Sequence, residues 1–438
     1  MSEKNKFINK EDIRKKIFDL TDEYYKLEHA TKKFIPGTTK VSYSGRVFDS
    51  EELKYGINSM LQYWLTSGQY TQEFENNMKN YFNSASSLLV NSGSSANLLM
   101  IATLCSNNII NHLNPGDEVI TPAVTFPTTL TPIIQNNLIP VFDDCKVGEY
   151  NIDVDLIENA ISKKTKCIFI PHTVGIPTNM DQIMKIVKKY NLFLLEDGCD
   201  CLGAKWDNKL MGTFGEMSSI SFYPAHHMTM GEGGMVIVNN RFMKKTALSI
   251  RDWGRDCWCP PGENNTCGKR FEWELGDLPY GYDHKYIYSN LGYNLKATDM
   301  QAALGCAQFK KLDQFILDRS NNADFFIENL KNLSDYLILP IIPAKAKPSW
   351  FGFPITLKKN VEKIKFVNYL NAANIETRQV FGGNILKQPG FKNIDYRLSG
   401  NLDGTNFIME NTIFFGVYPG LTNEMLEYVL EKIQRFFK

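Results

Sequence analysis

Residues 218–238, SSISFYPAHHMTMGEGGMVIV, decide how the rest of the chain is interpreted. The two ends of this stretch, 218–222 and 235–238, are apolar runs with the composition of buried β-strands. Between them lie two adjacent histidines, His226 and His227, and the Gly-Glu-Gly-Gly segment at 231–234. Because glycine permits positive φ and close backbone approach, the stretch predicts two strands joined by a tight turn.

The composition is that of a folded globular protein. The chain has 438 residues, 43% of them hydrophobic, which is enough for two or three domains around a large core. Basic and acidic residues number 48 each, so no charge excess favours nucleic acid or a basic membrane surface. The first residues lack the apolar segment of a signal peptide, and no uncharged apolar run approaches the roughly 20 residues of a membrane span. We therefore expect a cytoplasmic protein without nucleic-acid or membrane partners.

Short apolar strands alternate with amphipathic helices from residue 88 onward. We expect strands at 88–91, 118–122, 139–142, 167–171 and 192–197, and helices at 96–105, 128–135, 155–162 and 181–189. This alternation is typical of an α/β protein with a mostly parallel sheet covered on both faces. Since ligands bind beyond the carboxyl ends of such strands, residues 91–95, 197–201 and His226 are expected to converge.

The pattern predicts three parts of the chain. Residues 1–32 form a charged helical extension, 33–320 a large domain that ends in a helix from about 298 to 317, and 321–438 a smaller α+β domain. Residues 250–290 interrupt the large domain and are rich in Gly, Pro, Trp, Tyr and Cys. Loops of this length are functional or disordered, and the aromatic content favours a function.

The stretch at 218–238 resembles the cofactor segment of the DegT/DnrJ/EryC1/StrS sugar aminotransferases, Ser-Phe-x-x-x-Lys-x-x-x-x-Gly-Glu-Gly-Gly. Residues 292–303, GYNLKATDMQAA, are similar to the G-x-N-x-R-x-T-x-x-Q-A-A segment of that family. The resemblance implies the type I fold of aminotransferases that use pyridoxal 5'-phosphate (PLP), and a homodimer with composite sites. It implies cofactor-binding roles for Gly93, Ser94, Ser95 and Ser221 at the phosphate, Phe126 on the ring, Asp197 at the pyridine nitrogen, and Asn294 at the phosphate of the neighbouring subunit.

Single members of this set also have simpler interpretations. A strand–Gly–Ser–helix turn such as 93–96 is common, although its N–H groups and helix dipole suit a phosphate. Asp197 is as compatible with a turn or cap position as with a protonated pyridine nitrogen. By itself, Phe126 is better explained as a core residue. Only the combination is specific to the family.

His226 stands where the family has its Schiff-base lysine, and no lysine lies between Lys209 and Lys244. Imidazole cannot form an imine, so the cofactor would act as pyridoxamine 5'-phosphate (PMP), with His226 as a base. On a ketone that carries a neighbouring hydroxyl, such a site would eliminate the hydroxyl instead of transferring an amine. Tyr223, in the same turn, is a candidate to assist the leaving hydroxyl and equally a packing residue.

Four cysteines form a second pattern. Cys257-x-Cys259-x7-Cys267 lies in the long loop, and Cys199 lies 58 residues before Cys257. The spacing alone is compatible with zinc, a 2Fe-2S cluster or coincidence. Together with the histidine it resembles the CDP-4-keto-6-deoxyglucose 3-dehydrases of the same family, which implies a 2Fe-2S cluster on these four residues. Cys201 is a rival for Cys199.

This resemblance implies C3 deoxygenation of a CDP-linked 4-keto-6-deoxyhexose in the biosynthesis of lipopolysaccharide 3,6-dideoxyhexoses. An NADH-dependent flavin iron–sulfur reductase would supply electrons through the cluster, and residues 256–282 are a candidate docking face for it. The alternatives are a cluster-free dehydratase or aminotransferase acting on a dTDP- or GDP-deoxysugar, and a non-catalytic relative with structural zinc. Arg378, Trp350 and Tyr70 are possible substrate residues, although each is more simply explained as unassigned polar surface.

Overall fold

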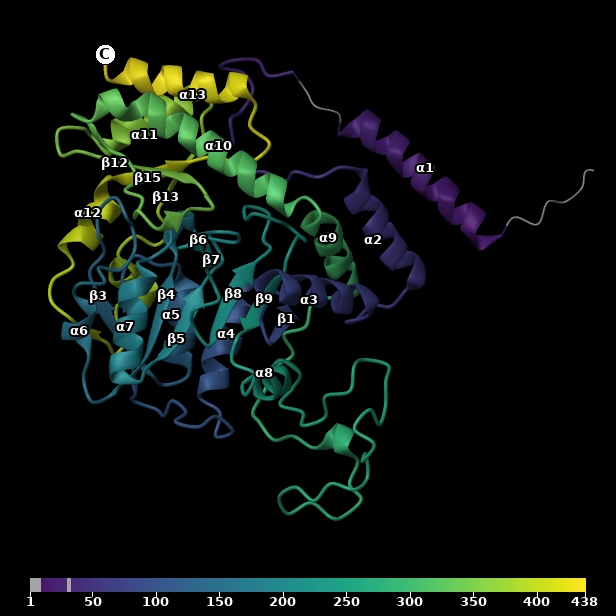
Figure 1. Cartoon of the computed structure of the whole chain (residues 1–438). Coiled ribbons are helices and arrows are strands. Elements are labelled where there is room, and N and C mark those ends of the chain that lie inside the picture. Colours follow the sequence, from purple (N-terminus) through teal and green to yellow (C-terminus); the bar gives the residue numbers. More distant parts are fainter. Residues whose placement is uncertain (1–8, 30–32) are drawn as a thin grey trace, which may run out of the picture.

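An eight-stranded sheet forms the centre of the computed structural model, which describes residues 9–29 and 33–438 (Figure 1). Its strand order is β1 (Ser86–Val90), β9 (Gly234–Val238), β8 (Met217–Ser221), β5 (Phe193–Asp197), β4 (Thr165–Pro171), β2 (Glu118–Pro122), β3 (Ile139–Asp143) and β14 (Arg397–Leu398). The strands from β8 to β14 run parallel, whereas β9 is antiparallel to both of its neighbours. The mostly parallel sheet predicted from the alternating pattern is therefore confirmed.

Helices cover both faces of this sheet, which explains why its strands are continuous apolar runs. The predicted crossover helices are present as α4 (Gly93–Leu104), α5 (Pro127–Gln135), α6 (Ile157–Ala160) and α7 (Met180–Tyr190), and α8 (Lys244–Arg251) is an addition. Helix α7 shows how the sequence sets the ends. Asn179 accepts a hydrogen bond from the N–H of Gln182 at the start, and Asn191 adopts a left-handed conformation at the end.

The amino-terminal helices lie to one side of the large sheet, and the first of them projects away from it (Figure 1). They are α1 (Lys10–Glu28), which packs against α2 (Ser50–Gln62), and α3 (Gln69–Phe82), which packs against β1; α9 (Asp299–Phe309) packs against α2 and α3. Residues 1–8 and 30–32 of the predicted extension lie outside the described residues. The prediction of one helix at 298–317 was wrong, because α9 ends at 309 and α10 (Leu312–Leu330) begins a new direction. Lys311 lies at this break, and its Nζ contacts Glu52 of α2 at 2.7 Å.

A smaller antiparallel sheet packs above the first. It contains β10 (Leu337–Ile338), β12 (Phe353–Leu357), β15 (Thr412–Phe415) and β13 (Thr377–Gln379), with α10, α11 (Lys363–Ala372), α12 (Asp403–Asn411) and α13 (Asn423–Phe436) around it. Phe326, Phe353 and Phe415 form the centre of its core. The same core contains Phe34 and Val41 from the amino-terminal part of the chain. Helix α10 continues without a break across residue 320, where the border of the large domain was predicted. A third, three-stranded sheet joins β11 (Ala346–Lys347), β6 (Lys205–Trp206) and β7 (Lys209–Leu210).

The long loop lies on the side of the large sheet away from the small sheet (Figure 1). It leaves after α8 and returns before α9, and bridges between Asp252 and Asn294 and between Arg255 and Tyr288 hold its two arms together at the base. Across the described ranges, no helix is long and apolar enough to cross a membrane.

Candidate active site

A cavity of about 800 Å³ lies where the carboxyl ends of the parallel strands face the small sheet. Its walls come from the turn after β1, the start of α5, the end of β5, the segment between β8 and β9, and C-terminal residues that include Phe351, Arg378 and Phe381. It brings together seven residues expected at the site from the sequence: Gly93, Ser94, Phe126, Asp197, Ser221, Tyr223 and His226. Three segments predicted to converge from their strand-end positions therefore do so.

The turn between β1 and α4 forms a small cradle at one end of the cavity. A Cβ on Gly93 would lie 2.7 Å from Cβ of Ser221 and 2.9 Å from Sγ of Cys199, so only glycine fits there. Gly234 packs equally closely, because its Cβ would lie 2.2 Å from the carbonyl of Ser92. The start of α4 and the nearby hydroxyls of Ser94 and Ser221 suit a phosphate. Ser95 does not line the cavity, and its N–H donates to Oγ of Ser92, which holds the turn.

Asp197 ends β5 and is held by four donors. Its Oδ2 accepts from Nδ2 of Asn97 at 2.8 Å and from Oγ1 of Thr129 at 2.7 Å. Its Oδ1 accepts from Oγ of Ser219 and from the N–H of Cys199, both at 3.2 Å. Such a set fixes the orientation of the carboxyl group at the cavity wall, where a carboxylate can bind a protonated pyridine nitrogen. Phe126 is half exposed in the same cavity, as a stacking residue requires.

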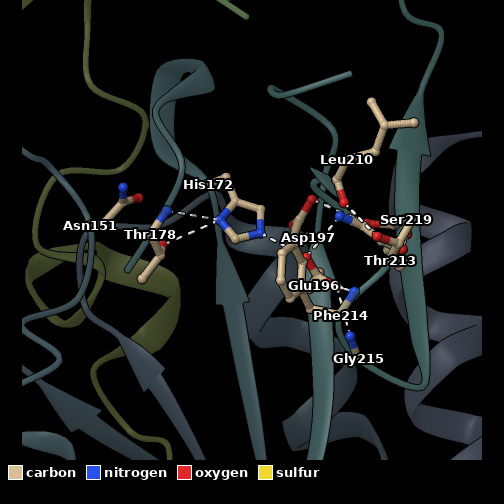
Figure 2. A network of polar contacts seen from close by, with 12 residues as sticks. Asn151, His172, Thr178, Glu196, Asp197, Leu210, Thr213, Phe214, Gly215 and Ser219 are labelled. Atoms are coloured by element: carbon tan, nitrogen blue, oxygen red, sulfur yellow. Dashed lines mark hydrogen bonds and ion pairs between the residues drawn. The ribbon is translucent and has the colours of Figure 1, made fainter. Parts of the chain in front are cut away.

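Behind Asp197, a fully buried pair joins His172 of the β4–α7 connection to Glu196 of β5 (Figure 2). Glu196 also accepts the backbone N–H groups of Gly212, Phe214 and Gly215 at 2.7–2.8 Å. Burial alone would raise the pKa of Glu196, but the hydrogen bond from His172 and these N–H groups lower it overall. The ionised Glu196 thus fixes the strand end that carries Asp197.

His226 faces the cavity beside Phe351, with the ring centroids 4.9 Å apart. Burial, and then the charge of Arg319, lower its pKa to about 4, so the imidazole is neutral at pH 7. Its Nδ1 lies 3.8 Å from Oδ1 of Asp200. His227 points elsewhere, since its Nε2 contacts the carbonyl of Ser349 at 3.1 Å. Of the two adjacent histidines, only the one at the family's lysine position lines the cavity.

Sequence reasoning missed two residues that lie close to His226. Asp200 lines the cavity three residues after Asp197, within the predicted strand-end segment. Arg319 is buried in α10 and donates to the carbonyls of Trp350, Phe351 and His226 at 2.9–3.1 Å. The sequence signal that could have identified Arg319 is an arginine on the buried face of helix α10. Of the possible substrate residues, Arg378 lines the cavity, whereas Trp350 and Tyr70 belong to hydrophobic cores.

Asn294 and three of the four cysteines lie outside this cavity. Asn294 is at the base of the long loop, where Nζ of Lys296 donates to its Oδ1 at 2.7 Å. Cys199 lines the cavity, but Cys257, Cys259 and Cys267 lie in the loop. Within the described ranges, no three His, Cys, Asp or Glu side chains are grouped so as to hold a metal ion. The cluster of four cysteines that the resemblance implies is therefore not assembled within the described residues of one chain, because β5 directs Cys199 into the cavity whereas the loop extends away from it.

The fold and the cavity define an enzyme-like protein of the aminotransferase type, and comparison with known proteins makes this specific. The chain belongs to the DegT/DnrJ/EryC1/StrS aminotransferase family, whose model matches residues 47–434. It is 47% identical over 428 residues to the lipopolysaccharide biosynthesis protein RfbH of Salmonella typhimurium, covering 97% of this chain and 98% of that protein. It is 42% identical to dTDP-4-dehydro-2,6-dideoxy-D-glucose 3-dehydratase of Saccharopolyspora spinosa, covering 97% and 92%.

A solved structure supports the same assignment of the fold. The GDP-4-keto-6-deoxy-D-mannose-3-dehydratase of E. coli with bound hydrated PLP matches with a TM-score of 0.82 and 31% identity. The match covers 90% of this chain and 98% of that one. The PLP-aminotransferase fold with a mostly parallel large sheet, predicted from the sequence, is thereby confirmed.

Proposed function

We propose that this chain is a PMP-dependent 3-dehydratase of a nucleotide-linked 4-keto-6-deoxyhexose in lipopolysaccharide deoxysugar biosynthesis. The observation that carries the proposal is His226, which stands at the lysine position and lines the cavity. The similarity to two sugar 3-dehydratases and to RfbH supports it. For the substrate we propose CDP-4-keto-6-deoxy-D-glucose, with the dTDP-linked sugar as the competitor that the 42% identical relative favours.

The residues of the cavity fit PMP. The cradle at Gly93, where a Cβ would collide with Ser221, leaves room for a phosphate at the start of α4. Asp197, with its four donors, is prepared for a pyridinium, and Phe126 for the ring face. When bound, PMP supplies an amine that condenses with a ketone and a ring that withdraws electrons from the adjacent carbon.

His226 performs the proton transfers. Because its imidazole is neutral at pH 7, its ring nitrogen would accept a proton from the carbon that PMP would supply beside its amine. The same imidazole would return the proton to the departing C3 hydroxyl, which would leave as water. Tyr223, which lies at the cavity wall, is placed to assist that hydroxyl, and Phe351 and Phe381 restrict water. Arg378 supplies a positive charge at the wall for the diphosphate of the nucleotide sugar.

The reductive half of the deoxygenation stays a separate prediction. A 2Fe-2S cluster on Cys199, Cys257, Cys259 and Cys267 does not fit the arrangement within one chain, so no electron-transfer step follows from this geometry. EPR of anaerobically purified, dithionite-reduced protein, with iron and sulfide counted on the same sample, tests it. About two irons per chain and a one-electron signal would support the cluster and its flavin reductase. Stoichiometric zinc without sulfide would favour the non-catalytic alternative.

We also propose that the enzyme is a homodimer. Asn294 lies outside its own cavity, as expected of a residue that reaches the cofactor phosphate of a neighbouring subunit. An open apolar groove between α2 and α9 is lined by Ile57, Met60, Leu61, Met300 and Leu304, and suits a second copy. Analytical ultracentrifugation of wild type and Met60→Glu would test this surface. A wild-type monomer would contradict the proposal.

The central experiment incubates PMP-loaded protein with CDP-, dTDP- and GDP-linked 4-keto-6-deoxyhexoses and detects loss of water by mass spectrometry. We expect dehydration of the CDP sugar, and none with His226→Asn, which keeps the cavity and removes the basic ring. Dehydration of the dTDP sugar alone would correct the substrate. Amine transfer, or no reaction with any of the three sugars, would overturn the proposed function.

A further inference from the structure

A second carboxyl group, that of Asp200, lies in the cavity beside the base. Its Oδ1 is 3.8 Å from Nδ1 of His226, and each side chain is only 13% exposed. In the described part of the chain, Nδ1 of His226 is buried without a hydrogen-bond partner. A buried ring nitrogen left in this state is costly, and a small movement of Asp200 would satisfy it.

The two cavity carboxyl groups are held in contrasting ways. Asp197 accepts four hydrogen bonds, whereas in the described residues Asp200 accepts one, from the N–H of Val174 to Oδ2 at 3.3 Å. The other oxygen of Asp200, Oδ1, is the one that faces Nδ1 of His226.

The turn that faces Asp200 is strained. Val174 has φ 50° and ψ 20°, a left-handed conformation that β-branched residues rarely adopt. The next residue, Gly175, also has positive φ, and a Cβ there would lie 1.8 Å from the carbonyl of Ser349. Close packing therefore holds the turn in place, with the N–H of Val174 directed at Asp200. Strain maintained at a cavity wall points to a function for the group it serves.

We propose that Asp200 is the positioning residue for His226, a role that rests on the proposed dehydration. A carboxyl oxygen of Asp200 accepts the Nδ1–H of the imidazole, which leaves the lone pair on Nε2 as the base. After Nε2 takes a proton from carbon, the same oxygen stabilises the imidazolium. The same proton then passes to the C3 hydroxyl as its carbon–oxygen bond breaks, water leaves, and the pair returns to its starting state.

Nitrogen NMR of the cofactor-free protein, labelled at its six histidines, tests this pairing without any catalysis. We expect His226, assigned with a His226→Gln sample, to be the Nδ1–H tautomer in the wild type at neutral pH. Asp200→Asn should shift it toward the Nε2–H tautomer, and Asp200→Glu should restore the Nδ1–H tautomer in part. Asp256→Asn is the matched control, because Asp256 contacts Nε2 of His284 at 2.7 Å in the loop. It should alter the signals of His284 and leave those of His226 unchanged.

The kinetic arm uses the PMP-loaded enzyme. We expect Asp200→Asn to lower kcat about 10²-fold with KM little changed, and Asp200→Glu to recover part of the loss. An unchanged His226 tautomer in this variant would overturn the pairing. A changed tautomer with an unchanged kcat would overturn the positioning role. If no substrate reacts even with wild type, the proposed function fails, while the NMR result still decides the pairing.

Discussion

Replacing Glu196 by glutamine tests whether the buried pair behind the cavity holds the end of β5 (Figure 2). The carboxylate accepts two backbone N–H groups on Oε1, from Phe214 and Gly215, and one on Oε2, from Gly212. His172 also donates to Oε2, because its Nδ1 already accepts the N–H of Thr178 and its proton must lie on Nε2. None of these backbone donors can turn to become an acceptor.

Either orientation of the glutamine amide therefore leaves two buried donors without an acceptor. If the amide nitrogen replaces Oε1, the N–H groups of Phe214 and Gly215 lose their bonds. If it replaces Oε2, Gly212 and His172 lose theirs. At about 1–3 kcal/mol for each unsatisfied donor, we expect the free energy of unfolding to fall by about 2–6 kcal/mol. That is a large part of a typical total of about 5–15 kcal/mol.

Urea unfolding at pH 7, followed by circular dichroism, measures the change. Asp143→Asn is the matched control, since Asp143 is a buried carboxyl whose Oδ2 has no partner in the described ranges. Burial raises the pKa of Asp143 to about 6, so at pH 7 the fold carries the cost of ionising it, and the amide should be neutral or slightly stabilising. If Glu196→Gln unfolds like the wild type, or no differently from the control, the network does not hold the strand end.

Three further predictions concern other parts of the molecule. Arg397→Met should lower stability by about 1–2 kcal/mol at pH 7, allowing for the partly exposed guanidinium. The hydrogen bond from Arg397 is the largest cause that lowers the pKa of Glu118 from 4.5 to about 2, with smaller contributions from Ser162 and Thr165, so the difference from wild type in urea unfolding should shrink as the pH falls through this window. Gly93→Ala should weaken PMP binding about tenfold in calorimetry, because of its contacts below 3 Å, whereas Gly390→Ala, with nothing within 4 Å, should not. His226→Lys should form a covalent PLP adduct visible by absorbance, and a folded variant without that band would contradict the position match.

The sequence predicted most of the large sheet because its strands are buried on both faces and therefore appear as short apolar runs. The same reasoning located the cradle at Gly93 and the acid at Asp197, since both lie at strand ends. The helix expected at 298–317 failed because its break at Lys311 depends on Glu52, more than 250 residues away in the chain. No local pattern records such a contact.

The contacts around His226 could not be predicted from the sequence for the same reason. Asp200 and His226 are 26 residues apart, and Arg319 reaches the carbonyl of His226 across 93 residues. The four cysteines show a different limit of reasoning from sequence. Cys199 and the three loop cysteines make a regular one-dimensional pattern, but spacing does not state where a loop of some 40 residues goes. In the structure Cys199 lines the cavity, whereas the loop that carries the other three cysteines extends away from it (Figure 1).

The surroundings of residue 226 explain why histidine can replace lysine here without rebuilding the site. Burial and the charge of Arg319 disfavour a cation at this position, as the pKa of His226 near 4 shows. The same surroundings would keep a lysine amine uncharged, which is the state in which an amine attacks an aldehyde. Under the proposed function, histidine therefore keeps the uncharged base that the site favours and lacks the primary amine that would tether the cofactor. On that proposal, one substitution converts a site for amine transfer into one for proton transfer, and Asp200 is in position to fix the tautomer of the ring.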